Sequence, residues 1–256
     1  MNQISNIDIY VSGMQKSLED KLFFVDKVCD IDKVIDFGCA DGSLLREMYK
    51  INPNLNYIGY DNNIAMILQS RMVTDCEKFK NIRFTDKYAF SNTKNALLNL
   101  SSVVHEVYSY SQPDDINIFW NQVFYQDFKY IAIRDFCISK SINRQVDIND
   151  YTKLIQSADN EQVNDYESIW GSLRDNRNLV HFLMKYRYTE NWDREVRENY
   201  FPITLETLLS MIPTYKYEIV YFEDYVLPFT KNKVKEDFDI DLHDNTHVKI
   251  LLKRKD

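Results

Sequence analysis

The chain has 256 residues, a formal net charge of −8 and a hydrophobic content of 45%. This length suffices for one α/β domain with an elaboration, and the acidity argues against a broad polyanion-binding surface but leaves a local basic patch open. The four cysteines lack the spacing of a zinc site, so they predict reduced thiols, no metal and a cytoplasmic location. No apolar stretch reaches the roughly 20 residues of a membrane span, and the N-terminus lacks a signal-peptide pattern.

The first helical pattern covers about residues 14–28. Apolar side chains recur there at helical spacing, with Ser17 as a candidate N-cap. The chain then enters residues 33–63, which carry three of its five glycines. Two short apolar runs in this window flank a turn of small residues and a helical segment, and this order predicts a strand, a tight turn, a helix and a second strand.

The turn and the two acidic residues beside it suggest a ligand site. Gly38 and Gly42 would let the backbone pass close to a ligand, with N–H groups at the start of the helix facing it. Asp61 ends the second strand, where a carboxylate can accept both hydroxyls of a ribose. The glycine pattern matches the dinucleotide fingerprint poorly, which disfavours a nicotinamide dehydrogenase. Asp36, two residues before the first glycine, suits a cationic ligand end better than a pyrophosphate.

The order Asp36-x-Gly38-x-Ala40-x-Gly42, followed by Asp61, resembles motifs I and II of the class I S-adenosylmethionine-dependent methyltransferases. The resemblance implies that the first acid and the turn hold the methionine moiety and that the second acid holds the ribose; an ordinary βα turn is the alternative. The family often folds a helix before motif I over the cofactor, so Tyr10, Met14 and Lys21 either line the site or belong to a helix packed on the sheet edge. The cofactor-binding residues that it implies are Asp36, Gly38, Cys39, Ala40, Asp41, Gly42, Asp61, Asn62, Asp86 and Ser101.

Further elements follow in the order that such a fold requires. Residues 64–71 predict a helix capped by Asn62 or Asn63, and residues 81–86 predict the third strand. Asp86 ends this strand where the family often places an acceptor for the adenine amino group, and an ordinary turn is the alternative. The apolar run at residues 96–100 predicts a buried parallel strand.

The carboxyl ends of the next strands supply candidate catalytic and acceptor-binding residues. His105 and Glu106 follow the strand at residues 96–100, and a histidine there could take a proton from an acceptor hydroxyl or amine. A helix-capping histidine is the alternative, and many methyltransferases of this class need no base. Arg134 and Asp135 end a strand predicted from residue 130, so they either contact substrate or form an ion pair at the sheet edge.

The motifs of two methyltransferase classes are absent from the sequence. It contains no Asp/Asn-Pro-Pro-Tyr segment for DNA amino-methylation and no Pro-Cys nucleophile for carbon-5 cytosine chemistry. Residues 116–128 predict a helix before the strand at residue 130. Residues 139–200 are charged and helical in spacing, with arginines among aromatics, and predict either a lid that selects the acceptor or a solvated helical cap.

The last part of the chain predicts a short helix at residues 204–212 and two strands at 217–226 and 246–252, joined by a charged connection at 228–244. The resemblance implies an α/β fold, a Rossmann-like doubly wound seven-stranded sheet whose last strand is antiparallel, with a helical insertion after strand 5. The predicted domains are a core of residues 1–138 and 201–256 and an insertion of residues 139–200.

The resemblance implies an S-adenosylmethionine-dependent methyltransferase. It would pass a methyl group to an O or N nucleophile of a small molecule or an exposed nucleotide and release S-adenosylhomocysteine. The acidity favours a small acceptor, and the arginine-rich insertion favours a nucleotide. The alternative is a cofactor-binding regulatory or partner subunit that does not itself methylate. No membrane partner is predicted.

Overall fold

The computed structural model describes residues 18–255, so Tyr10, Met14 and Ser17 lie outside the described part of the chain. The described residues divide into two compact units. The first unit comprises residues 18–135, 212–223 and 249–255, and the second comprises Phe136–Met211 and Asp224–Val248. No helix in this part of the chain is long and apolar enough to cross a membrane.

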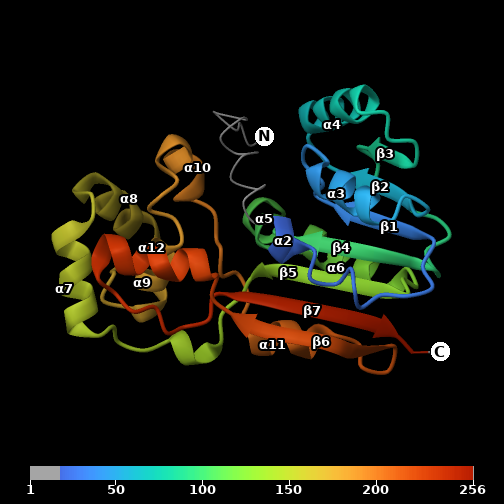
Figure 1. Cartoon of the computed structure of the whole chain (residues 1–256). Coiled ribbons are helices and arrows are strands. Elements are labelled where there is room, and N and C mark those ends of the chain that lie inside the picture. Colours follow the sequence, from blue (N-terminus) through green and yellow to red (C-terminus); the bar gives the residue numbers. More distant parts are fainter. Residues whose placement is uncertain (1–17, 256) are drawn as a thin grey trace. The chain divides into compact units, whose positions relative to one another are not determined.

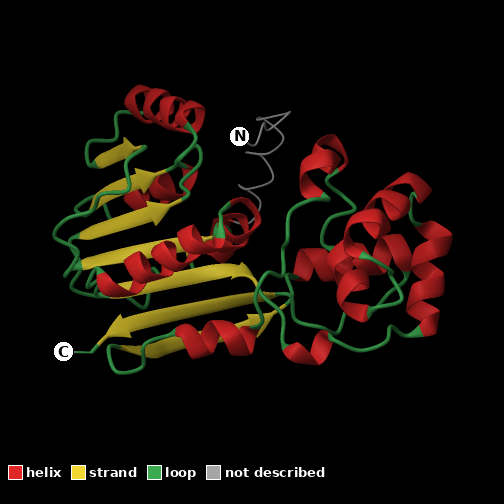
Figure 2. Ribbon diagram, turned by 180° about the vertical axis from the view of Figure 1, so that it is seen from behind, coloured by secondary structure: helices red, strands yellow, loops and turns green. Residues whose placement is uncertain are grey.

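A seven-stranded sheet organises the first unit, with the strand order β3-β2-β1-β4-β5-β7-β6 (Figure 1). The strands from β3 to β5 are parallel neighbours, and β7 runs in the opposite direction to β5 (Figure 2). This confirms the predicted sheet and its antiparallel last strand. The strands are β1 (Lys33–Phe37), β2 (Asn56–Tyr60), β3 (Ile82–Thr85), β4 (Ala96–Ser101), β5 (Tyr130–Phe136), β6 (Tyr217–Tyr225) and β7 (His247–Arg254).

Helices flank this sheet, and Figure 2 shows α6 across the face that points away from the viewer in Figure 1. Every residue of β4 is buried, as expected for a central strand covered on both faces. The register pairs Asp36 on β1 with Asn99 on β4, which sets the centre of the site described below. The helices of this unit are α2 (Leu18–Lys21), α3 (Ser43–Ile51), α4 (Ile64–Cys76), α5 (Val104–Tyr110) and α6 (Pro113–Tyr125).

One element of this unit differs from the prediction. The helix expected at residues 14–28 is described only as α2, and residues 22–27 continue as turns, since Phe23, Phe24 and Val25 have lower helix propensity than straight-chain residues. Strand β5 starts at Tyr130 and ends in Arg134, Asp135 and Phe136, as predicted.

The second unit has its own apolar core, which includes the fully buried Leu154, Tyr166 and Phe182. Residues 228–244, predicted as a charged connection, instead contain α12, because Val234 and Phe238 bury one side of it in this core. The helices of this unit are η1 (Lys140–Ile142), α7 (Ile148–Ser157), α8 (Asn160–Trp170), α9 (Asn176–Leu183), η2 (Thr189–Asn191), α10 (Trp192–Glu195), α11 (Leu205–Met211) and α12 (Pro228–Phe238).

Candidate active site

A buried carboxyl group lies at the centre of the candidate site. Asp36, near the end of β1, is 3% exposed and accepts a hydrogen bond of 2.7 Å from Asn99 Nδ2 on β4. Burial raises the pKa of Asp36 to about 7, partly offset by the Asn99 bond and by the positive charge of Lys21. A cationic ligand would hold this group in its ionised form.

Three buried polar groups near this carboxyl have no partner among residues 18–255. Among these residues, Asn99 Oδ1 accepts no hydrogen bond and Ser101 Oγ forms none. Both side chains point to one face of β4 because they are two residues apart. Lys21, 8% exposed, forms no hydrogen bond or ion pair with the described residues. Buried polar groups are nearly always satisfied, so these three indicate a missing ligand.

The ammonium group of Lys21 lies in a mixed electrostatic environment. Burial and the nearby Arg134 lower its pKa to about 8, while the carboxylates of Asp36, Asp135 and Asp41 act in the opposite direction. The Lys21 ammonium is therefore a buried cation close to the Asp36 carboxyl group. An anionic ligand group bound beside Lys21 would stabilise its charged form.

The α2 helix that carries this lysine is tied to the sheet by ion pairs. Asp20 Oδ2 lies 2.8 Å from Arg134 Nη2 on β5, and Asp20 Oδ1 lies 2.7 Å from Lys249 Nζ on β7. Arg134 also donates a 2.8 Å hydrogen bond to Ser102 Oγ. Arg134 thus contacts the carboxylate of α2 and the turn after β4, and its predicted role in binding substrate stays a prediction.

The glycine turn after β1 gains its shape from positive φ angles. Gly38 has φ 74°, and a Cβ atom there would lie 2.6 Å from Val103 Cγ2. Gly42 has φ 75°, and a Cβ atom there would lie 2.5 Å from the Phe84 ring. Any other residue would therefore meet both strain and a clash at either position.

Three N–H groups of this turn donate hydrogen bonds inside the protein, and the prediction that N–H groups at the start of α3 face a ligand stays a prediction. Gly38 N and Cys39 N both donate to Tyr60 O, at 2.8 and 2.9 Å, and Ala40 N donates to Asp61 Oδ2 at 2.9 Å. The reason is that the turn curls against the end of β2. It offers a ligand close approach, while side chains supply the charged contacts.

Asp41 and Cys39, two predicted cofactor residues, have structural contacts. Asp41 pairs with Arg46 at 3.2 Å, and its Oδ1 accepts a bond from Ser43 N at the start of α3. The Cys39 thiol is buried and lies beside Gly59, and burial raises its pKa. Their contribution to cofactor binding stays a prediction that would act through the backbone.

The second acid of the motif stands at the end of β2. Asp61 Oδ2 accepts from Ala40 N, and Oδ1 accepts from Asn63 N at 2.8 Å. Each carboxylate oxygen has a further lone pair for a hydroxyl donor. Burial raises the pKa of Asp61, which the two backbone bonds partly oppose. Asn62 and Asp86, predicted for the ribose and adenine side, are exposed beyond the ends of β2 and β3.

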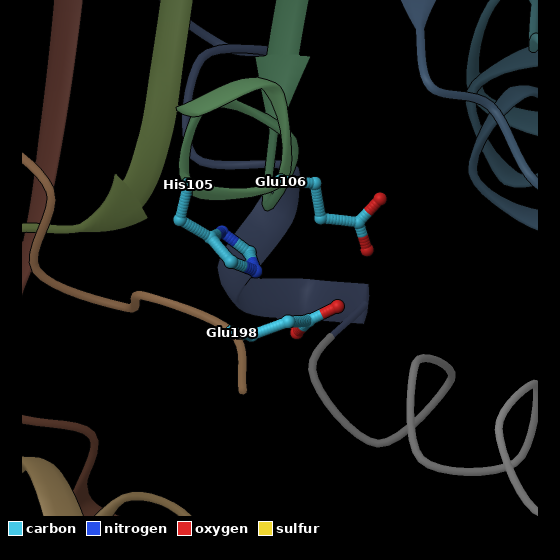
Figure 3. Close-up of side chains that lie close together, drawn as sticks. All are labelled: His105, Glu106 and Glu198. Atoms are coloured by element: carbon cyan, nitrogen blue, oxygen red, sulfur yellow. The ribbon is translucent and has the colours of Figure 1, made fainter. Parts of the chain in front are cut away.

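His105 and Asp135, predicted for different roles, form a buried pair. His105 Nδ1 lies 2.6 Å from Asp135 Oδ1, and Asp135 Oδ2 accepts a 2.6 Å bond from Val104 N at the start of α5. Figure 3 shows the side chains of His105 and Glu106 leaving the first turn of α5 in different directions. The structure therefore places Asp135 against α5.

Asn99 is a candidate site residue that the sequence analysis did not include. The signal was a polar residue inside the apolar run from Ala96 to Leu100, but its meaning depends on which strand lies beside it. Only the β1–β4 pairing shows that its amide faces Asp36.

Comparisons with known proteins agree with this geometry. A family model described as "Methyltransferase domain" matches residues 30–103. A tRNA (guanine-N(7)-)-methyltransferase of Prochlorococcus marinus (strain MIT 9515) is 28% identical over 94 residues, which cover 33% of this chain and 43% of that protein. The match thus spans less than half the length of this curated relative.

Solved structures share the fold across nearly the whole chain. The MccD protein has a TM-score of 0.53 and 11% identity, covering 95% of this chain and 98% of its own. The PH0226 protein from Pyrococcus horikoshii OT3 has a TM-score of 0.52 and 12% identity, covering 99% and 94%. Identities this low show the fold alone.

The methyltransferase-domain model covers residues 30–103, which contain β1 to β4, and the whole sheet has the strand order of the class I, Rossmann-like methyltransferase fold. The resemblance predicted from the first acid, the glycine turn and the second acid is confirmed. The cofactor of this class of domain is S-adenosylmethionine, as predicted.

The residues present fit this cofactor. Its amino-acid end carries one ammonium and one carboxylate, and the site offers unpartnered acceptors on Asn99 and Ser101, a buried carboxyl on Asp36 and an unpartnered ammonium on Lys21. Opposite charges placed this way complement a zwitterion.

Proposed function

We propose that this chain is an S-adenosylmethionine-dependent methyltransferase acting on an O or N nucleophile of a small molecule or an exposed nucleotide. The observation that carries the proposal is the set of unpartnered buried groups around Asp36, which complements a zwitterionic amino-acid end beside a glycine turn. A domain that only bound a neutral nucleoside would have no use for a buried lysine that forms no ion pair within residues 18–255.

The cofactor-binding residues of this proposal divide by ligand group. Asp36 and Asn99 receive the ammonium, Ser101 adds an acceptor, Lys21 receives the carboxylate, and Asp61 receives the ribose hydroxyls. The turn of Gly38, Cys39, Ala40, Asp41 and Gly42 supplies close approach, while Asn62 and Asp86 border the nucleoside.

When bound, the cofactor supplies an electrophilic methyl group on a sulfonium. The protein then aligns the acceptor in line with the carbon–sulfur bond and excludes water, and such alignment accounts for much of the acceleration of two-substrate reactions. His105 and Glu106 are the candidate catalytic residues, because they lie on the first turn of α5 directly after β4. Arg134 is the candidate for contact with the acceptor.

Two observations support different classes of acceptor. The curated relative acts on a guanine of tRNA, as its name states, which supports a nucleotide acceptor, whereas the net charge of −8 supports a small one. Residues 139–200 are proposed as the lid that selects between them. The cytoplasmic location predicted from the scattered cysteines belongs to this proposal too.

Calorimetric titration with S-adenosylhomocysteine tests the proposal. Wild type is expected to bind in the micromolar range, and Asp61→Ala is expected to bind about 10- to 100-fold more weakly, since it loses hydrogen bonds to a charged acceptor. Asp75→Ala is the matched control, because this aspartate is exposed near the end of α4. Failure of the folded wild type to bind either S-adenosylmethionine or S-adenosylhomocysteine would refute the proposal.

A further inference from the structure

The buried pair of His105 and Asp135 has a geometry that fixes the imidazole. Asp135 Oδ1 lies 2.6 Å from His105 Nδ1, and Asp135 Oδ2 accepts from the backbone of Val104 at 2.6 Å and of His105 at 3.4 Å. Both side chains are at least 94% buried. One carboxylate therefore anchors the ring and the start of its helix together.

This arrangement determines which ring nitrogen carries the proton. An ionised carboxylate only accepts hydrogen bonds, so a neutral His105 must keep its proton on Nδ1 to satisfy Asp135. Nε2 then holds the lone pair. Asp135 also accepts from the backbone N–H groups of Val104 and His105, as an ionised carboxylate does.

The pair lies at the edge of the sheet that carries the proposed cofactor site. It joins the end of β5 to the first turn of α5, and that turn begins directly after β4. Val103, two residues before His105, lies so close to the glycine turn that a Cβ atom on Gly38 would be 2.6 Å from its Cγ2. The residue that precedes α5 therefore packs against the glycine turn.

We propose that Asp135 is the positioning residue of His105, holding it as a base whose Nε2 takes a proton from the acceptor. The inference rests on the proposed function and deepens it, because a base is needed only for a protic nucleophile. The acceptor class is therefore a hydroxyl, an N–H or an ammonium group. An unprotonated ring nitrogen such as guanine N7 has no proton to give up, so the proposal separates this chain's acceptor from that of its tRNA-modifying relative.

The step balances with the residues named. The acceptor's O–H or N–H bond breaks, its proton passes to His105 Nε2, and its lone pair forms the new bond to the methyl carbon. The carbon–sulfur bond breaks with its electron pair remaining on sulfur, which leaves a neutral thioether. The imidazolium that results is stabilised by the carboxylate of Asp135 until the proton leaves to solvent.

Nitrogen-15 NMR of the full chain labelled at histidine tests the positioning role without an acceptor. The chain has four histidines, and the signal missing from His105→Gln identifies His105. The proposal predicts, in wild type at neutral to mildly alkaline pH, a protonated Nδ1 and a pyridine-like Nε2. In Asp135→Asn the amide can donate to Nδ1, so the proton should move to Nε2. A wild-type His105 protonated on Nε2, or on both nitrogens, would overturn the proposal.

Two further measurements separate this inference from the proposed function. Asp135→Asn should bind S-adenosylhomocysteine within about threefold of wild type, while Asp127→Asn, at a half-buried aspartate after α6 that pairs with Lys216, should change neither the affinity nor the tautomer. If the wild type did not bind the cofactor, the proposed function would be contradicted. If it bound the cofactor but carried the His105 proton on Nε2, only this inference would be contradicted.

The acceptor class is tested by incubating wild type and Asp135→Asn with tritiated S-adenosylmethionine and either total RNA or a small-metabolite extract. Labelled products are expected to carry the methyl group on an oxygen or nitrogen that bore hydrogen, at a rate about 10²- to 10⁴-fold lower in the variant. Asp135→Glu, which retains a carboxylate, should recover part of the rate. Label on guanine N7, or equal rates in both proteins, would overturn the inference.

Discussion

At the scale of single residues, the site pairs two buried groups whose charges depend on pH near neutrality. The pKa of Asp36 is raised to about 7 and that of Lys21 is lowered to about 8, in both cases mainly by burial. Burial disfavours the charged form of each group, and a bound ligand group of opposite charge favours that charged form. The unliganded site is thus prepared for a zwitterion, whose two charges satisfy both groups at once.

The affinity for S-adenosylhomocysteine should therefore pass through a maximum between about pH 7 and pH 8. Below about 7, Asp36 in the free protein is protonated, so binding must release that proton and weakens by up to tenfold per pH unit. Above about 8, Lys21 in the free protein is neutral, so binding must take up a proton and weakens in the same way. Calorimetry at several pH values, in buffers of different ionisation enthalpy, measures both the affinity and the protons exchanged.

Two substitutions test which residue causes the loss of affinity at acidic pH and which causes it at alkaline pH. Asp36→Asn should weaken binding and remove the acidic limb, and Lys21→Met should weaken binding and remove the alkaline limb. Lys27→Met is the control for the second, since Lys27 lies in the following turn and contacts the neighbouring Asp26 carboxylate and the Tyr221 ring. An affinity that does not vary from pH 6 to pH 9 would show that these two groups do not hold the ligand.

The conformation of the turn after β1 was predictable because its residues are close together in sequence. Gly38 and Gly42 have positive φ angles, which suit the tight turn predicted from their spacing. Asn99 was missed, and Asp135 was assigned to substrate and not to His105, because both contacts join residues from different strands or helices. Their meaning depends on strand order, which a single sequence does not display.

At the scale of elements, the turn after β1 is the most constrained part of the site. Gly38→Ala adds a Cβ atom 2.6 Å from Val103 Cγ2 at a φ of 74°. We expect a loss of about 1–3 kcal/mol in the free energy of unfolding and at least a tenfold loss in S-adenosylhomocysteine affinity. Urea unfolding and calorimetry measure the two effects.

Gly171→Ala is the matched control for this substitution. Gly171 also has a positive φ, 87°, but the nearest atom to an added Cβ is 3.7 Å away, so it carries the backbone strain without the clash. It should cost stability and leave S-adenosylhomocysteine affinity unchanged. If Gly38→Ala lowered stability no more than Gly171→Ala and bound the ligand normally, the close packing of the turn would be irrelevant to the site.

Element boundaries were predictable where the apolar pattern decides them and not where distant packing does. Strand β4 lies within one residue of its prediction, because its buried run is bounded by polar residues. Helix α12 was missed because Val234 and Phe238 acquire a buried face only against helices that are far away in sequence.

At the scale of the whole molecule, the chain combines a class I methyltransferase sheet with a second compact unit. That unit joins Phe136–Met211 to Asp224–Val248, two segments that flank β6 in the sequence. The predicted insertion of residues 139–200 falls within it, and its proposed role in selecting the acceptor stays a prediction. Sequence periodicity predicted helices in this region. It could not predict that residues after β6 belong to the same apolar core as these helices.

The account's central claim is that the groups around Asp36 bind the amino-acid end of the cofactor. The most direct test compares calorimetric affinities for S-adenosylhomocysteine and for 5′-methylthioadenosine, which keeps the nucleoside and the thioether but lacks the amino-acid end. We predict that S-adenosylhomocysteine binds at least about 30-fold more tightly, or about 2 kcal/mol, and that Lys21→Met removes most of this difference while Lys27→Met preserves it. Equal affinities for the two ligands in wild type would contradict the account.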